Sequence, residues 1–123
     1  MFELRVVSHF AAAHQLEECG GGCERLHGHN WKVEVYVAGP SLGEQGLLVD
    51  FRVIKDATER VVKALDHQFL NELTEFKGVN PSSENIARHI FRALSRELNT
   101  ENYRVNRVTA WESESACATY QEE

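Results

Sequence analysis

Two long segments of alternating apolar and polar residues, separated by a glycine-rich connection, constrain the fold of this chain most strongly. In residues 2–14 the apolar side chains share one parity, and His14 falls on the same parity. Residues 27–38 repeat the pattern, with His27, His29 and the apolar residues on one face. Because successive side chains of a strand point to opposite faces, each segment predicts a strand with one buried face. The three consecutive glycines between them permit a long turn, so an antiparallel hairpin is the simplest interpretation.

Helical spacing follows in two later segments. Asp50 is a suitable N-cap for an amphipathic helix that ends near residues 66–67. Residues 81–83 (Pro-Ser-Ser) open a second helix, which residues 99–100 close. Each helix carries apolar residues on one side and charges on the other, so each is expected to pack on the sheet.

Two further strands, at residues 103–111 and 116–120, are predicted to complete the domain. The resulting order, ββααββ, predicts an α+β fold in which two helices pack on one face of an antiparallel sheet. A length of 123 residues suits a single domain, residues 1–123.

Composition excludes several classes of protein. Hydrophobic residues make up 42% and charged residues 26%, as in a globular protein. The net charge of −6 argues against nucleic-acid binding, which needs a basic surface. Residues 1–13 lack the pattern of a secretory signal, no apolar run is long enough for a membrane helix, and three cysteines favour free thiols. We therefore expect a cytoplasmic protein without a membrane partner, whose exposed sheet edges are covered by other subunits.

His27-Gly28-His29 is the sharpest local motif. Positions i and i+2 of a strand face the same way, so both imidazoles can bind one ion, and the hairpin adds His14. Three imidazoles with one open position are typical of catalytic zinc, although imidazole also binds other transition metals. The alternative is that these histidines are ordinary surface or core residues; the third histidine of the same parity favours the metal site.

The remaining histidines and cysteines have less specific interpretations. His89 lies beside the apolar side of the second helix and is predicted to be structural. Cys23 precedes His27 by four residues, where a nearby cation would favour its thiolate and make it a base. Alternatively, Cys19 and Cys23 form a disulfide or a second metal clip. Cys117, in a predicted strand, is expected to be a small buried side chain.

Two acidic positions also have alternative interpretations. Asp66 can orient His67 and stabilise its protonated form, as in a proton relay, yet such a pair is more often a solvated helix end. Glu112, from the residues alone, is predicted to be a solvated turn carboxylate.

Five motifs in order resemble one family over essentially the whole chain, that of the 6-pyruvoyl-tetrahydropterin synthases. Within it, the chain is most similar to the bacterial 6-carboxy-5,6,7,8-tetrahydropterin synthases of queuosine biosynthesis, because three residues separate Cys23 from His27. The motifs are Phe10-Ala11-Ala12-Ala13-His14, Cys23-x3-His27-Gly28-His29-Asn30, Leu65-Asp66-His67-x2-Leu70-Asn71, Pro81-Ser82-Ser83-Glu84-Asn85 and Trp111-Glu112-Ser113.

The resemblance implies the tunnelling fold, in which subunits join their sheets into barrels, usually as a hexamer of two stacked trimers with active sites at the interfaces. It implies zinc as the cofactor and gives each site residue a role. The three histidines match the zinc ligands, Cys23 the proton-abstracting group, Asp66 and His67 the relay, and Glu112 the carboxylate that anchors the pterin; Ser82 and Ser83 are expected at the substrate.

The resemblance also implies the reaction. The substrate would be 7,8-dihydroneopterin triphosphate, and the products 6-carboxy-5,6,7,8-tetrahydropterin, acetaldehyde and triphosphate. Two alternatives remain open at this point: a 6-pyruvoyl-forming or related pterin enzyme, and a zinc-stabilised scaffold without catalysis, which predicts a saturated fourth ligand and unfolding on chelation.

Overall fold

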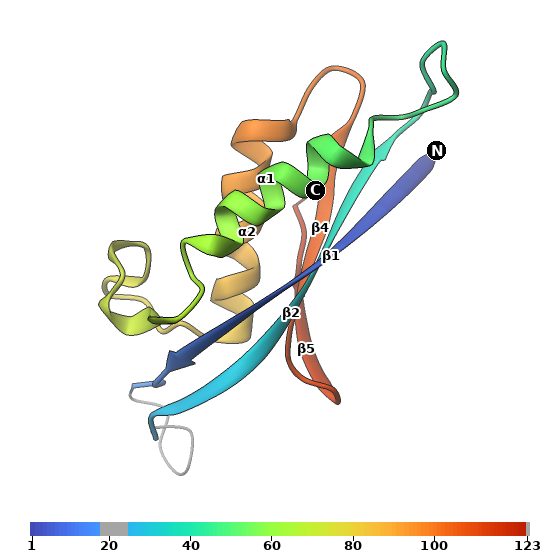
Figure 1. The fold of residues 1–123 in the computed structure, drawn as a ribbon. Coiled ribbons are helices and arrows are strands. Elements are labelled where there is room, and N and C mark those ends of the chain that lie inside the picture. Colours follow the sequence, from blue (N-terminus) through green and yellow to red (C-terminus); the bar gives the residue numbers. More distant parts are fainter. Residues whose placement is uncertain (18–24, 123) are drawn as a thin grey trace.

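The computed structural model describes residues 1–17 and 25–122. These residues form one twisted sheet with two helices on one of its faces (Figure 1). The elements are β1 (Phe2–His14), β2 (His27–Gly39), α1 (Phe51–Lys63), β3 (Gln68–Phe69), the short 3-10 helices η2 (Leu70–Glu72) and η3 (Thr74–Phe76), α2 (Ser83–Leu98), β4 (Arg104–Ser113) and β5 (Ala116–Tyr120).

The predicted hairpin is confirmed. β1 and β2 pair antiparallel along their whole length, with His14 opposite His27 and Ala12 opposite His29. β2 then pairs antiparallel with β4, and β4 with β5, so the sheet order is β3-β1-β2-β4-β5.

The sheet is mixed rather than purely antiparallel, which corrects the predicted ββααββ order. The additional strand β3 pairs parallel with the end of β1, placing Gln68 opposite Ala12. The chain reaches this edge because Ala11 donates its backbone N–H to the Asp66 carboxylate at 2.9 Å, and His67 donates its own to the Ala11 carbonyl at 2.6 Å. A strand of two residues is too short to give an alternating pattern, so the sequence did not predict it.

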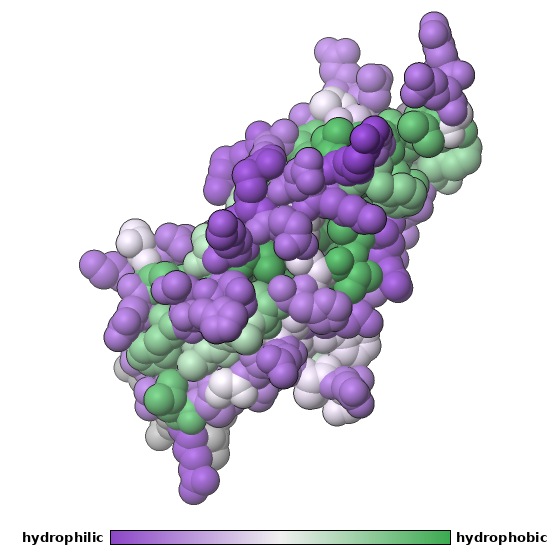
Figure 2. Space-filling model, in the orientation of Figure 1, coloured by the Kyte–Doolittle hydropathy of each residue, from purple (hydrophilic) through white to green (hydrophobic). Residues whose placement is uncertain are grey.

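The core lies between the helices and the sheet. On the sheet face that the helices cover, every second side chain of β2 from Trp31 to Val37 is fully buried. Ile54 of α1 and Ile90 of α2 are fully buried as well. Burying such a side chain contributes about 1.5–3 kcal/mol, which fixes both helices on the sheet. The outer surface of the helical layer is mostly hydrophilic, interrupted by apolar patches (Figure 2).

Both helices begin where the sequence predicts. Asp50 accepts a hydrogen bond from the Arg52 backbone N–H, and its side chain also contacts the Arg52 guanidinium. The Arg52 side-chain hydrogen bonds, followed by this backbone bond, lower the pKa of Asp50 to about 2. Ser82 Oγ accepts from the Asn85 backbone N–H at 3.1 Å, so Ser82 caps α2. Neither described helix is long and apolar enough to cross a membrane.

The opposite face of the sheet carries a polar network instead of helices. Glu34 is buried there, with its carboxylate 2.9 Å from the Arg5 guanidinium and in contact with the Trp111 indole N–H. Cys117 pairs with Trp111 across β4 and β5 on this face. Its side chain is exposed, so the prediction of a buried cysteine is wrong: β5 is an edge strand, and neither α1 nor α2 covers this side of it.

Candidate metal centre

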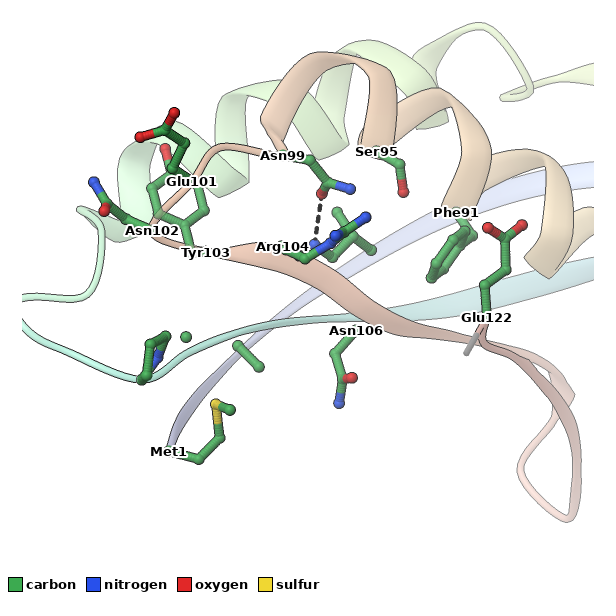
Figure 3. A pocket seen from close by; sticks show the side chains of 14 residues that line it. Met1, Phe91, Ser95, Asn99, Glu101, Asn102, Tyr103, Arg104, Asn106 and Glu122 are labelled. Atoms are coloured by element: carbon green, nitrogen blue, oxygen red, sulfur yellow. Dashed lines mark hydrogen bonds between the residues drawn. The ribbon is translucent and has the colours of Figure 1, made fainter.

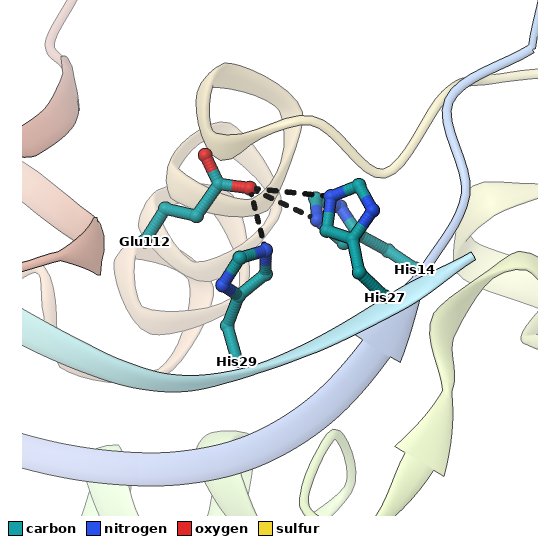
Figure 4. A group of neighbouring side chains, drawn as sticks. All are labelled: His14, His27, His29 and Glu112. Carbon is teal, nitrogen blue, oxygen red and sulfur yellow. Dashed lines mark hydrogen bonds and ion pairs between the residues drawn. The ribbon is translucent and has the colours of Figure 1, made fainter. Parts of the chain in front are cut away.

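Three imidazoles converge at one end of the sheet (Figure 4). His14 ends β1, and His27 and His29 begin β2, so the register of the hairpin sets all three on the helix side. Their ring centroids are 4.7–5.2 Å apart. The alternation of side chains along the two strands therefore predicted correctly that these three histidines lie together.

The hydrogen bond of His14 fixes which of its nitrogens faces the cluster. Its side chain is 1% exposed, and Nδ1 lies 2.7 Å from the carbonyl oxygen of Pro81. A carbonyl only accepts, so Nδ1 carries the proton, and in the neutral ring Nε2 carries the lone pair. Metal-binding histidines are commonly held in this way by a backbone carbonyl.

Glu112 supplies a fourth donor atom. Its Oε1 lies 3.0 Å from Nε2 of His14, 3.0 Å from Nε2 of His29 and 3.8 Å from Nε2 of His27. The interpretation of Glu112 as a solvated turn residue is wrong, because β4 continues to Ser113 and turns this side chain toward the histidines. Its position depends on how β4 pairs with β2, which sets Trp111 opposite Lys32, and nothing local in the sequence reveals that pairing.

The donor set fits a transition-metal ion. Nε2 of His29 is buried and makes no well-formed hydrogen bond within the described part of the chain, although Glu112 lies within ion-pair distance. Burial is the main cause that lowers the pKa of His29; the charges of His14 and His27 lower it further, and Glu112 opposes them. His29 is therefore neutral at pH 7, the form that binds metal. Imidazole nitrogens with one carboxylate oxygen suit zinc among the common ions.

Asp66 and His67 form the predicted pair, at the edge of β1. Nδ1 of His67 lies 2.9 Å from the Asp66 carboxylate. The Ala11 backbone hydrogen bond is the main cause that lowers the pKa of Asp66, followed by the hydrogen bond to His67, so Asp66 stays ionised. The His67 side chain is 82% exposed, and no contact among the described residues joins it to the three histidines.

A hollow of about 540 Å³ lies at the edge of β1 and is open to solvent; His67, His29, Gly28 and the end of β1 line it. His14, His27 and Glu112 do not line this hollow. Ser82 and Ser83 lie at the start of α2, next in the chain to the Pro81 carbonyl that holds His14.

The predicted base, Cys23, lies outside the described residues, as does Cys19. Its expected position in the loop before His27 therefore stays a prediction.

A second cavity, of about 530 Å³, lies at the other end of the sheet (Figure 3). It is lined by Met1, the end of α2 and the start of β4, and Asn99 accepts there from the Val105 backbone N–H. None of the residues that line it is a histidine or a cysteine.

Fold and site together define an α+β protein with a cluster of three histidines and a carboxylate that could hold a metal ion. Residues 3–123 match the model of the 6-pyruvoyl tetrahydropterin synthase family. The chain belongs to this family, as the motifs predicted.

Named relatives agree with this assignment. A 6-carboxy-5,6,7,8-tetrahydropterin synthase from Synechocystis sp. is 43% identical over 90 residues, covering 69% of this chain and 68% of the relative. A dihydroneopterin monophosphate aldolase from Pyrococcus furiosus is 36% identical over 105 residues, covering 84% and 82%. The structure of 6-pyruvoyl tetrahydropterin synthase from Caenorhabditis elegans superimposes with a TM-score of 0.87 at 26% identity, covering 99% of this chain and 96% of that one.

Proposed function

We propose that this protein is a zinc-dependent lyase that converts 7,8-dihydroneopterin triphosphate to 6-carboxy-5,6,7,8-tetrahydropterin in queuosine biosynthesis, with release of acetaldehyde and triphosphate. The observation that carries the proposal is the convergence of His14, His27, His29 and Glu112 within 4.8 Å of one another. The 43% identity to a 6-carboxy-5,6,7,8-tetrahydropterin synthase supports the choice of reaction.

The three histidines would hold the ion, and a zinc ion there would supply a Lewis acid for the side-chain hydroxyls of the pterin. The Glu112 carboxylate has the geometry to accept two parallel hydrogen bonds from the amino and ring N–H groups of the pterin, as it would from a guanidinium. It would thereby orient the side chain of the substrate toward the three histidines.

Proton transfer falls to Cys23 and His67. The Cys23 thiolate takes the proton from the carbon of the substrate side chain. Because the Asp66 carboxylate fixes the Nδ1 proton of His67, Nε2 of that ring is the nitrogen that can deliver or accept a proton. Triphosphate leaves, one water molecule is consumed, and carbon–carbon cleavage separates acetaldehyde from the ring, which keeps the carboxylate.

The metal site and the Asp66–His67 pair are proposed to meet across subunit boundaries. We expect a cytoplasmic assembly of single-domain chains, a hexamer of two trimers with joined sheets, and the free edge of β1 suits such joining. Sedimentation should give six times the 14.0 kDa of the chain. Mixing inactive His27→Ala and His67→Ala proteins, followed by reassembly, should restore part of the activity; no recovery would mean that each chain completes its own site.

Product analysis tests the reaction. Incubation of the zinc-loaded protein with 7,8-dihydroneopterin triphosphate should release acetaldehyde and triphosphate in equal amounts. In Cys23→Ala, turnover should fall about 100- to 10,000-fold, the usual contribution of a general base, while the zinc content stays at the wild-type value. Parallel loss of zinc and activity would contradict the role of Cys23.

A second candidate reaction is favoured by one relative, the dihydroneopterin monophosphate aldolase at 36% identity. An enzyme of that kind would consume dihydroneopterin monophosphate, so both phosphates should be offered side by side. Turnover of the monophosphate alone would establish the aldolase, and a 6-pyruvoyl product from the triphosphate would establish the pyruvoyl-forming synthase.

A further inference from the structure

We propose that Glu112 is a displaceable fourth ligand, which closes the metal site in the absence of substrate and leaves the ion when it takes hold of the pterin ring. The inference rests on the proposed function and deepens it. The Glu112 carboxylate would bind the metal ion first and the pterin ring second. Binding of the ring would therefore open a coordination position on the ion.

His14 turns one ring nitrogen toward the Glu112 carboxylate. Nδ1 of His14 donates its proton to the Pro81 carbonyl, which leaves Nε2 as the nitrogen that faces Glu112 Oε1, at 3.0 Å. Without a metal ion, a proton on Nε2 joins these two atoms; when the ring is neutral, Nε2 presents a lone pair, and a cation can take the place of that proton. A metal ion bound to Nε2 of His14 therefore has the Glu112 carboxylate beside it.

The distances are short enough for a shared ion. Two ligand atoms about 2.0–2.1 Å from a tetrahedral zinc ion lie roughly 3.3 Å from each other. The separations of Glu112 Oε1 from the three Nε2 atoms, 3.0, 3.0 and 3.8 Å, lie on either side of this value, and all four donor atoms lie within 4.8 Å of one another. Glu112 Oε1 is therefore close enough to share one ion with the three nitrogens.

The second oxygen of Glu112 and its place on β4 allow the side chain to change partners. Its side chain is 31% exposed, and among the described residues no hydrogen bond or ion pair holds its second oxygen, Oε2. It lies one residue from the end of β4, where the pairing with β5 is irregular between Trp111 and Ser113.

Glu34 provides the contrast within the same sheet. Its side chain is 6% exposed and is held by Arg5, by the Tyr36 hydroxyl at 3.3 Å and by the Trp111 indole. These contacts fix Trp111 on the opposite face, so the backbone next to Glu112 is anchored while the Glu112 side chain is not. A carboxylate on a rigid strand with one uncommitted oxygen is suited to changing partners.

Two crystal structures of the zinc-loaded protein test the exchange, one without ligand and one with neopterin as the probe. In the first, one Glu112 oxygen should lie about 2.0–2.2 Å from zinc. In the second, Glu112 should lie beyond bonding distance and contact the pterin ring. A water molecule in place of Glu112 in the first structure, or a Glu112–zinc bond kept in the second, would overturn the inference.

Zinc affinity gives an independent readout, measured by competition with a chromogenic chelator. Glu112→Gln should bind zinc about tenfold or more weakly, because the amide is a poorer ligand than the carboxylate. The matched control is Glu114→Gln, an exposed carboxylate two residues further along the same hairpin, which should bind zinc as the wild type does. Equal affinity in Glu112→Gln and wild type would exclude Glu112 as a ligand.

The outcomes separate this inference from the proposed function. If the three histidines bind zinc and acetaldehyde is released while Glu112 does not bind zinc, the proposed ligand exchange is wrong and the proposed function stands. If zinc does not bind the histidines at all, the ligand exchange and the proposed function are both wrong.

Discussion

At the scale of single residues, the two ring nitrogens of His14 have separate tasks. Nδ1 satisfies the Pro81 carbonyl in the buried start of α2, and Nε2 faces the other histidines. His14 is therefore structural even without an ion, whereas His27, with a side chain 34% exposed, has its importance only in the site.

This difference predicts unequal effects on the metal-free protein. His14→Ala leaves the Pro81 carbonyl buried without a donor, which should lower the free energy of unfolding by about 1–3 kcal/mol. His27→Ala should lower it by clearly less, while both variants lose zinc binding. Urea unfolding in the presence of a chelator measures the first effect; equal destabilisation by both substitutions would contradict it.

His89 gives a prediction on pH that does not involve the metal. It packs against Phe76, with ring centroids 5.6 Å apart, and burial is the main cause that lowers its pKa, with Arg96 adding to the effect and Glu75 opposing it. Because the folded pKa lies below the unfolded value of about 6.5, the unfolded chain binds more protons in the interval between them. The stability contributed by neutral His89 is complete above about pH 6.5 and is lost as the pH falls toward the folded pKa.

The metal-free His89→Gln variant isolates this contribution. Between pH 7 and pH 5 its free energy of unfolding should fall less than that of the metal-free wild type, measured in urea at each pH. Parallel curves for the two proteins would show that His89 titrates alike in the folded and unfolded chain.

At the scale of elements, the start of α2 ties helix stability to the site. Ser82→Ala removes the cap and should cost about 1 kcal/mol. Because Pro81 is the preceding residue and holds His14, the same substitution should also weaken zinc binding. Chelator competition and urea unfolding measure the two effects.

Asp50→Ala is the matched control, since Asp50 caps α1 in the same manner at the other helix. It should lower stability without changing zinc affinity. Unchanged zinc affinity in Ser82→Ala would show that the cap does not position His14.

The elements also show what the sequence could reveal. A period of two along β1 and β2 predicts which face each residue takes, so the parity of the residues alone was enough to bring the three histidines together. Helix starts were predictable because capping depends on residues within one turn. The strand β3 and the position of Glu112 beside the histidines could not be predicted from local patterns. Both depend on the pairing of strands that are distant in the sequence.

At the scale of the whole molecule, the core extends well beyond the candidate metal site, which it meets at Trp31, whose ring centroid lies 5.2 Å from that of His14 and 5.6 Å from that of His29. Most of the buried apolar residues of β2, α1 and α2 pack against one another. The chelated protein should therefore stay folded, with an unchanged far-UV circular dichroism spectrum, and unfold cooperatively at a lower Tm. Zinc at 100 times its Kd would add about 2.7 kcal/mol.

Unfolding on chelation would instead support the scaffold interpretation, in which the ion is part of the fold. A filled fourth position on the ion does not by itself distinguish a scaffold from an enzyme, since the proposal places Glu112 there in the absence of substrate. Displacement of Glu112 by neopterin does distinguish them, because only the enzyme opens its metal site to a ligand.

The pairing of His14 with His27 at the end of a long hairpin has one more consequence. Sliding β1 past β2 by a single residue would send the imidazoles of one strand to the opposite side of the sheet from those of the other. A slip of two residues would keep the side but carry His14 almost 7 Å away. Only the native alignment brings the three rings together, so zinc binding reports that β1 and β2 have paired in the correct register.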